Sequence, residues 1–111
     1  MWEGLPDVVR RYFELDPNRD GELFIGLFSD NATVLDERQT HRGTDEIREW
    51  RDGPATKYSY TMEVFGTEEI DPDRFLVTGR LTGNFPGETA DLRWDFTISG
   101  AQISRLVIAP P

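Results

Sequence analysis

Hydrophobic residues recur at helical spacing in the first half of the chain. This pattern predicts amphipathic helices over residues 5–15 and 20–28. A third helix is predicted to begin at a Thr44 cap and to end at residues 52–54, where Asp-Gly-Pro breaks it. A short strand, residues 32–36, separates the second helix from the third.

Apolar and polar residues alternate from residue 58 onward, which is typical of strands with one buried face. The predicted inward residues are Tyr58, Tyr60, Met62 and Val64, then Phe75, Val77, Gly79 and Leu81, then Leu92, Trp94, Phe96 and Ile98. A last strand covers residues 101–109, and turns are predicted at 71–73, 84–87 and 99–100. The predicted outer residues include Thr78, Arg80, Thr82, Arg93, Asp95 and Thr97. This polar face is either bare or a hydrophilic dimer contact.

These elements predict an α+β fold in a single domain over residues 1–111. Three N-terminal helices would pack on one face of a strongly curved antiparallel sheet and form a cone with a pocket. Gly79 on the inner face is expected to leave extra room there. A concave apolar cavity with a few polar groups is the usual form of a small-molecule site.

Composition narrows the classes of function. The chain has 21 acidic and 12 basic residues and a net charge of -9, which argues against binding to nucleic acid or to an anionic membrane. It has no cysteine, and its one histidine, His41, falls in a polar loop that we expect to be exposed. We therefore expect no metal site and no cofactor. The N-terminus lacks the apolar core of a signal peptide, which predicts a cytoplasmic protein.

Residues 16–21, DPNRDG, match the first half of a calcium-binding loop. The twelfth position of such a loop needs a bidentate glutamate, and here it is Leu27. A capped turn between two helices explains the same residues.

Two polar residues occupy positions where the apolar pattern calls for hydrophobic ones. Tyr12 lies on the buried stripe of the first helix, and Asp36 shares a strand face with Ala32 and Val34. They could form a binding or proton-transfer site. Alternatively, Tyr12 could meet a backbone group or water in an ordinary core, and Asp36 could cap a turn or pair with an arginine.

Two stretches resemble a known family: VVRRYFELDPNRDGELFIGLFSDNATVLD (Val8–Asp36) and RGTDEIREW (Arg42–Trp50). They are similar to the nuclear transport factor 2-like superfamily, in particular to SnoaL-like polyketide cyclases and ketosteroid isomerases. The likeness continues more loosely to about Ile108. It implies the conical fold, but the superfamily hosts isomerases, dehydratases, hydrolases and proteins without known chemistry.

The likeness to ketosteroid isomerases assigns roles to individual residues. The oxyanion-hole tyrosine of that family falls on Tyr12 and its aspartate base on Asp36. The second oxyanion donor, a protonated aspartic acid, is replaced by Trp94, whose indole N–H can donate one hydrogen bond. Asp95 should point outward, and Arg51 stands where aromatic residues support the isomerase pocket. These departures argue against steroid isomerisation as such.

The sequence therefore leaves two hypotheses. In the first, the cone binds a small, mostly apolar ligand and acts as a cofactor-free isomerase or cyclase-like lyase through Tyr12, Asp36 and Trp94. The expected ligand-binding residues are Phe28, Val34, Trp50, Tyr58, Tyr60, Met62, Val77, Gly79, Leu81, Phe96 and Leu106. In the second, the domain is non-catalytic and serves self-association, with Tyr12 and Asp36 structural. By analogy with the family, a homodimer through the outer sheet face is expected in either case.

Overall fold

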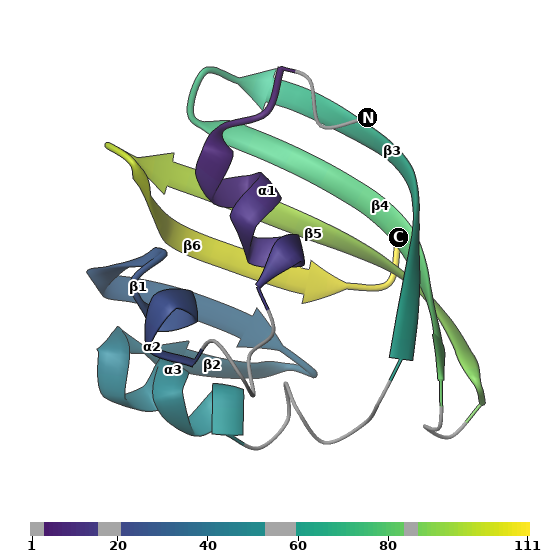
Figure 1. Cartoon of the computed structure of the whole chain (residues 1–111), viewed down its shortest axis with the longest axis horizontal. Coiled ribbons are helices and arrows are strands. Elements are labelled where there is room, and N and C mark those ends of the chain that lie inside the picture. The colour runs from purple at the N-terminus through teal and green to yellow at the C-terminus, as the bar shows by residue number, and fades with distance from the viewer. Residues whose placement is uncertain (1–3, 16–20, 53–59, 84–86) are drawn as a thin grey trace.

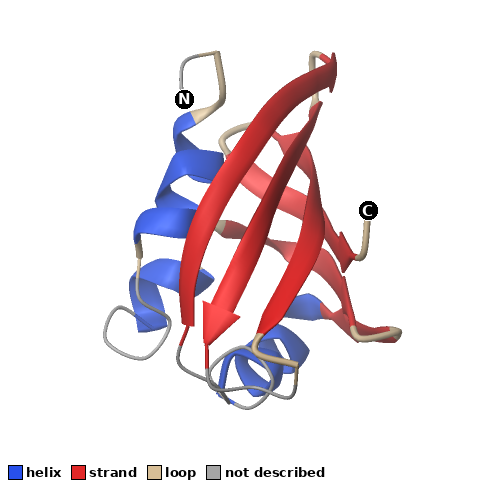
Figure 2. Cartoon of the chain, turned by 90° about the vertical axis from the view of Figure 1, so that its right-hand side faces the viewer, coloured by secondary structure: helices blue, strands red, loops and turns tan. Residues whose placement is uncertain are grey.

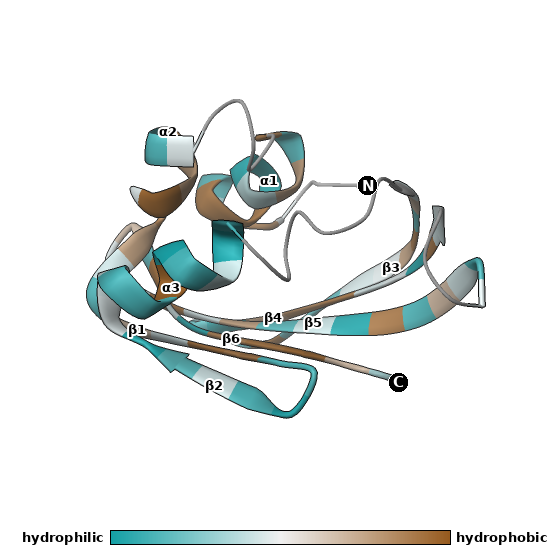
Figure 3. Ribbon diagram, turned by 90° about the horizontal axis from the view of Figure 1, so that it is seen from below, coloured by the Kyte–Doolittle hydropathy of each residue, from teal (hydrophilic) through white to brown (hydrophobic). Residues whose placement is uncertain are grey.

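The computed structural model describes residues 4–15, 21–52, 60–83 and 87–111. The elements are α1 (Asp7–Glu14), α2 (Gly21–Ile25), β1 (Phe28–Asp36), β2 (Gln39–Arg42), α3 (Gly43–Asp52), β3 (Tyr60–Asp71), β4 (Arg74–Gly83), β5 (Thr89–Ser99) and β6 (Gln102–Ala109). The helices lie on one side of the sheet, as Figure 3 shows. This arrangement confirms the α+β prediction (Figure 1).

The six strands form one sheet in the order β2-β1-β6-β5-β4-β3. Neighbouring strands are antiparallel except for β1 and β6, which run parallel. The long strands β3, β4 and β5 bend around the helices, as Figure 2 shows, and the sheet does not close on itself. The predicted curved sheet of a cone is thus confirmed.

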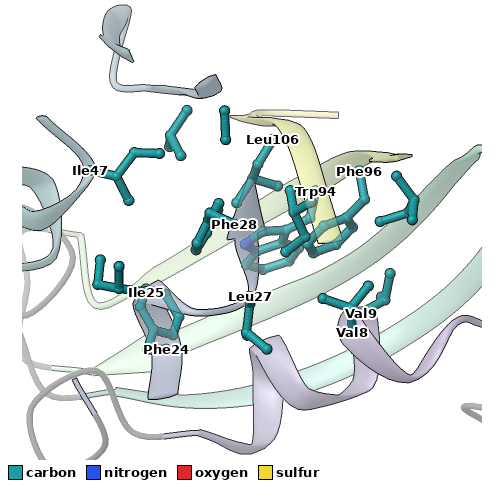
Figure 4. Packing of buried hydrophobic residues seen from close by; sticks show 14 of the residues in the cluster. Val8, Val9, Phe24, Ile25, Leu27, Phe28, Ile47, Trp94, Phe96 and Leu106 are labelled. Atoms are coloured by element: carbon teal, nitrogen blue, oxygen red, sulfur yellow. The ribbon is translucent and has the colours of Figure 1, made fainter. Parts of the chain in front are cut away.

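The core lies between the helices and the concave face of the sheet (Figure 4). Each helix contributes two buried apolar residues, and the strands contribute their inward residues. The helical ones are Val8, Val9, Phe24, Ile25, Ile47 and Trp50, and the fully buried strand residues are Ala32, Val34, Val77, Phe96, Ile103 and Leu106. Burial of this apolar surface is the main stabilising force of the fold.

The second helix is shorter than predicted. It ends at Ile25, and Phe28 begins β1 instead of closing the helix. The amide of Leu27 bonds to the carbonyl of Phe24, so a turn at Gly26 already redirects the chain. The short apolar run fits a helix end and a strand start equally well, and the parallel pairing of Phe28 with Ile103 of β6 decides for the strand.

The segment predicted as a polar loop forms the strand β2. Glu37 and Arg38 adopt left-handed φ values of 50° and 66°, which make a tight turn after β1. Asp36 then pairs with Gln39, and Val34 pairs with His41. The prediction was wrong because β2 carries no apolar alternation, and its pairing depends on the neighbouring strand.

The turn predicted at 71–73 is present, and the carboxylate of Asp71 accepts a hydrogen bond from the amide of Asp73 at 3.0 Å. Gly100, with a φ of 62°, makes the turn between β5 and β6. The calcium-like segment lies almost entirely outside the described residues. Among the described helices, none is long and apolar enough to cross a membrane.

Candidate functional site

The carboxylate of Asp36 is turned toward the helices and accepts a hydrogen bond from a buried indole. Asp36 is the half-buried last residue of β1. The Nε1–H of Trp50 donates to Oδ2 of Asp36 over 3.0 Å. Trp50 lies on the inner face of α3 and is only 2% exposed. Trp50 was expected to line a pocket, and the structure shows it buried in the core with this polar contact.

His41 lies beside this pair and not in an exposed loop. It is half-buried on β2, and its ring centroid is 6.3 Å from that of Trp50. The turn after β1 places His41 opposite Val34 and therefore on the helix side of the sheet. Sequence reasoning missed this position, because it depends on the pairing of β2 with β1, which the local pattern of β2 does not show.

Tyr12 lies within a cluster of aromatic rings. Its ring is half-buried, and its centroid lies 4.9 Å from Phe13, 5.4 Å from Phe24 and 5.3 Å from Phe96. Phe28 is 6.5 Å away. These rings come from helices and strands of the core, so Tyr12 lies on the inner side of α1. The helical spacing of the apolar residues in the sequence indicated the same side.

Phe24 connects the two parts of the candidate site. Its ring packs against Tyr12 on one side and stacks on Trp50 on the other, with a centroid distance of 6.2 Å and an angle of 30°. A continuous aromatic path therefore runs from Tyr12 to the indole that binds Asp36. Phe24 was absent from the predicted site residues, although its helical spacing marked it as an inward residue.

Trp94 lies at the other end of the aromatic cluster. It is 4% exposed and pairs with Val77 and Ile108 in the sheet. Its ring meets Phe13 edge-on at 5.4 Å. The structure thus places Trp94 beside α1, in contact with a ring neighbour of Tyr12, whereas the Asp36–Trp50 bond lies under α3.

The remaining predicted lining residues differ in their burial. Val34, Val77, Phe96 and Leu106 are fully buried, and Leu106 pairs with both Val34 and Phe96. Met62 and Leu81 pair with each other on β3 and β4 and are half-buried. Tyr58 lies outside the described residues, and of Tyr60 the structure describes the backbone as the start of β3.

The structure explains the glycine at position 79 differently from the sequence analysis, which expected it to leave extra room on the inner face. A Cβ at this position would lie 2.6 Å from the carbonyl oxygen of Glu63 and 3.3 Å from the Cε methyl of Met62. The register of β3 and β4 shifts between Val64 and Gly66, next to this contact. The glycine therefore permits a close approach of two backbones at an irregularity of the sheet.

Arg51 does not support the site as the family's aromatic residues do. Its side chain is 12% exposed, and its Nε donates to the carboxylate of Asp52 at 2.8 Å. This hydrogen bond raises the pKa of Arg51 and lowers that of Asp52. The guanidinium also covers Gly21 at the start of α2. Arg51 thus ties α3 to α2.

The outer face of the sheet carries ion pairs. Arg74 binds Asp95 through Nε and Nη2 at 2.9 and 2.6 Å, and Arg80 binds Asp91 through Nε at 2.7 Å. Each hydrogen-bonded carboxylate raises the pKa of its arginine, and Arg80 lowers the pKa of Asp91. The predicted outward direction of Asp95 is confirmed. Across the described residues, no cluster of three acidic, histidine or cysteine side chains could hold a metal ion.

Comparison with solved structures gives many matches. A protein from Sinorhizobium meliloti, described as a candidate polyketide cyclase, is 34% identical, with 95% of each chain covered and a TM-score of 0.85. A protein of ketosteroid isomerase-like fold from Catenulispora acidiphila, crystallised with trimethylamine, is 14% identical over 94% of this chain and 85% of its own, with a TM-score of 0.77. A nuclear transport factor 2-like protein from Exiguobacterium is 19% identical over 94% and 98%, with a TM-score of 0.76. No family model and no curated protein matches the chain.

Proposed function

Because the chain belongs to the SnoaL-like branch of the nuclear transport factor 2-like superfamily, we propose that it binds a small, mostly apolar ligand on the concave side of its sheet and catalyses proton transfer next to a carbonyl group. It would act without a cofactor, as an isomerase or a cyclase-like lyase, within a single domain. In this proposal, the apolar lining is formed by those residues inferred from the sequence that lie on the inner face in the described part of the chain, with Phe24 added between Tyr12 and Trp50.

The observation that carries this proposal is the placement of Asp36. Its carboxylate is half-buried on the concave side of the sheet, and its bonding partner Trp50 is a neutral donor. Because this donor is neutral, the contact puts no positive charge beside the carboxylate. The indole itself packs on Phe24 in the apolar core. A carboxylate beside an apolar core can serve as a general base toward a ligand bound there.

In the proposed reaction, Asp36 removes a proton from the carbon next to the carbonyl group of the ligand. The electron pair moves onto the carbonyl oxygen, and the hydroxyl of Tyr12 donates a hydrogen bond to the resulting enolate. Trp94 serves as a second donor or closes the apolar space behind Phe13. In an isomerisation, Asp36 then returns the proton to a carbon further along the conjugated system.

The test uses 3-cyclohexen-1-one, whose isomerisation to the conjugated 2-cyclohexen-1-one is followed by ultraviolet absorbance. Asp36→Asn and Tyr12→Phe are each expected to lower kcat on the order of a hundredfold or more. Asp30→Asn, an exposed residue of the same strand, is the matched control and should keep the wild-type rate. A wild-type rate in Asp36→Asn would show that Asp36 is not the base.

The Asp36–Trp50 bond also favours a second candidate function, in which the pair is structural and the domain is non-catalytic. In that case no turnover of the ketone exceeds the buffer rate, and Asp36→Asn changes only stability. Native mass spectrometry of the purified protein would then find no apolar ligand. A co-purified small molecule that is lost in Trp94→Ala would favour the first candidate.

We further propose a homodimer through the outer face of β3 to β6. The protein carries a net charge of -9, but on this face arginines nearly balance the acidic residues. The four arginines are Arg74, Arg80, Arg93 and Arg105, and the five acidic residues are Glu63, Glu68, Asp71, Asp91 and Asp95. A nearly neutral surface reduces the repulsion between two acidic copies. Sedimentation equilibrium at moderate salt tests whether the protein is a dimer. A cytoplasmic location stays a prediction from the sequence.

A further inference from the structure

One side chain joins the polar and the aromatic parts of the candidate site. Trp50 is almost fully buried, and its ring face stacks on Phe24. Its N–H points to Asp36, and the centroid of the His41 ring lies 6.3 Å from that of the indole. The indole is therefore held in place by groups from α2 and β2, and its donor is aimed at one oxygen of Asp36.

This hydrogen bond restricts the carboxylate. Donation to a charged acceptor is stronger than donation to a neutral one, and here the bond is partly buried. The backbone of Asp36 is fixed as well, because β1 ends there in the tight turn of Glu37 and Arg38. Because Oδ2 accepts this hydrogen bond and the main chain of Asp36 is fixed by the strand and the turn, the direction of Oδ1 is restricted as well.

We propose that Trp50 is the positioning residue of Asp36: its N–H holds Oδ2 so that Oδ1 faces the ligand and accepts the proton. This inference rests on the proposed function. An arginine at the same place would also orient the carboxylate, but it would put a full positive charge beside it. The indole N–H gives the orientation without adding a charge.

The test replaces Trp50 by phenylalanine, which keeps an aromatic ring over Phe24 and removes the N–H. Misplacement of a base affects the chemical step and leaves ligand binding nearly unchanged. For 3-cyclohexen-1-one, we expect Trp50→Phe to lower kcat about tenfold to a hundredfold while KM stays within about twofold. Ile47→Val, a buried position on the same helix face, is the control for packing and should keep the wild-type kcat.

A double variant separates positioning from a general structural effect. If Trp50 acts through Asp36, Trp50→Phe causes no further loss of kcat in the Asp36→Asn background. An equal loss in both backgrounds, or the same loss in Ile47→Val, would overturn the positioning role. If Trp50→Phe keeps full activity while Asp36→Asn loses it, the inference is wrong and the proposed function stands. If Asp36→Asn itself keeps the wild-type rate, both are wrong.

Discussion

The two faces of the sheet hold their carboxylates in different ways. On the outer face, Asp95 is bound by the guanidinium of Arg74 through two nitrogen atoms. On the concave face, Asp36 is bound by the single N–H of Trp50. The outer carboxylate meets a charge in contact with water, whereas the inner one meets a neutral group against an aromatic core.

This difference indicates which of the two faces is suited to catalysis. An exposed ion pair contributes little stability, because water and salt screen it, so it serves solubility and association. The half-buried carboxylate of Asp36 is the one that we propose as a base, and its partner is a neutral donor. The comparison can be tested by removing matched groups from the two faces.

The largest effect is expected from loss of the indole on the concave face. Trp50→Ala should lower the free energy of unfolding by about 3–5 kcal/mol, because it leaves a cavity beside Phe24 and removes the donor to Asp36. The matched change on the outer face is Phe65→Ala, where the ring is 52% exposed under Arg80. It should cost less than about 1 kcal/mol. Equal losses in urea unfolding would contradict the contrast between the faces.

A smaller effect is expected from the glycines of β3 and β4. Gly79→Ala should destabilise the protein by about 1–3 kcal/mol, because the new methyl group meets the carbonyl oxygen of Glu63 at 2.6 Å. Gly66→Ala is the control, since its methyl group would meet the hydroxyl of Thr78 at an ordinary 3.7 Å. It should be neutral or stabilise by less than about 1 kcal/mol. Thermal unfolding of both variants measures the difference in their stability. Similar unfolding midpoints would show that the backbone at the strand irregularity shifts to make room for the methyl group.

The smallest effect is a pH dependence on the outer face. Arg80 lowers the pKa of Asp91 below its ordinary value of 3.8. The pair therefore stabilises the folded protein above that pH, and its contribution is lost as the pH falls through the folded-state pKa. The denaturation midpoints of wild type and Asp91→Asn should differ slightly at about pH 7 and converge at about pH 2. A difference that persists in acid would contradict this assignment.

The sequence predicted the long strands and the direction of their side chains well. Strict alternation around Trp94 and Phe96 indicated the buried face, and it also indicated that Asp95 points outward. Such alternation is a local property, so no knowledge of distant neighbours was required. The resemblance of residues 8–36 and 42–50 to a known superfamily supplied the overall arrangement.

The contacts of the candidate site were predicted less well. Neither the Trp50–Asp36 bond nor the position of His41 follows from local pattern, because both depend on β2 folding back on β1 and on α3 covering them. Phe28 was assigned to the wrong element because its pairing partner, Ile103, lies far along the chain. Long-range partners decide these positions, and a single sequence does not reveal them.

The parallel pairing of β1 with β6 has a consequence for how the protein forms during synthesis. The strand that ends at Asp36 has β2 on one side and the last strand of the described sheet on the other. The hairpin of β1 and β2 therefore cannot join the rest of the sheet until β6 has left the ribosome. Pairing across such a long stretch of chain is slow to form, so the surroundings of Asp36 should be among the last parts of the molecule to become native.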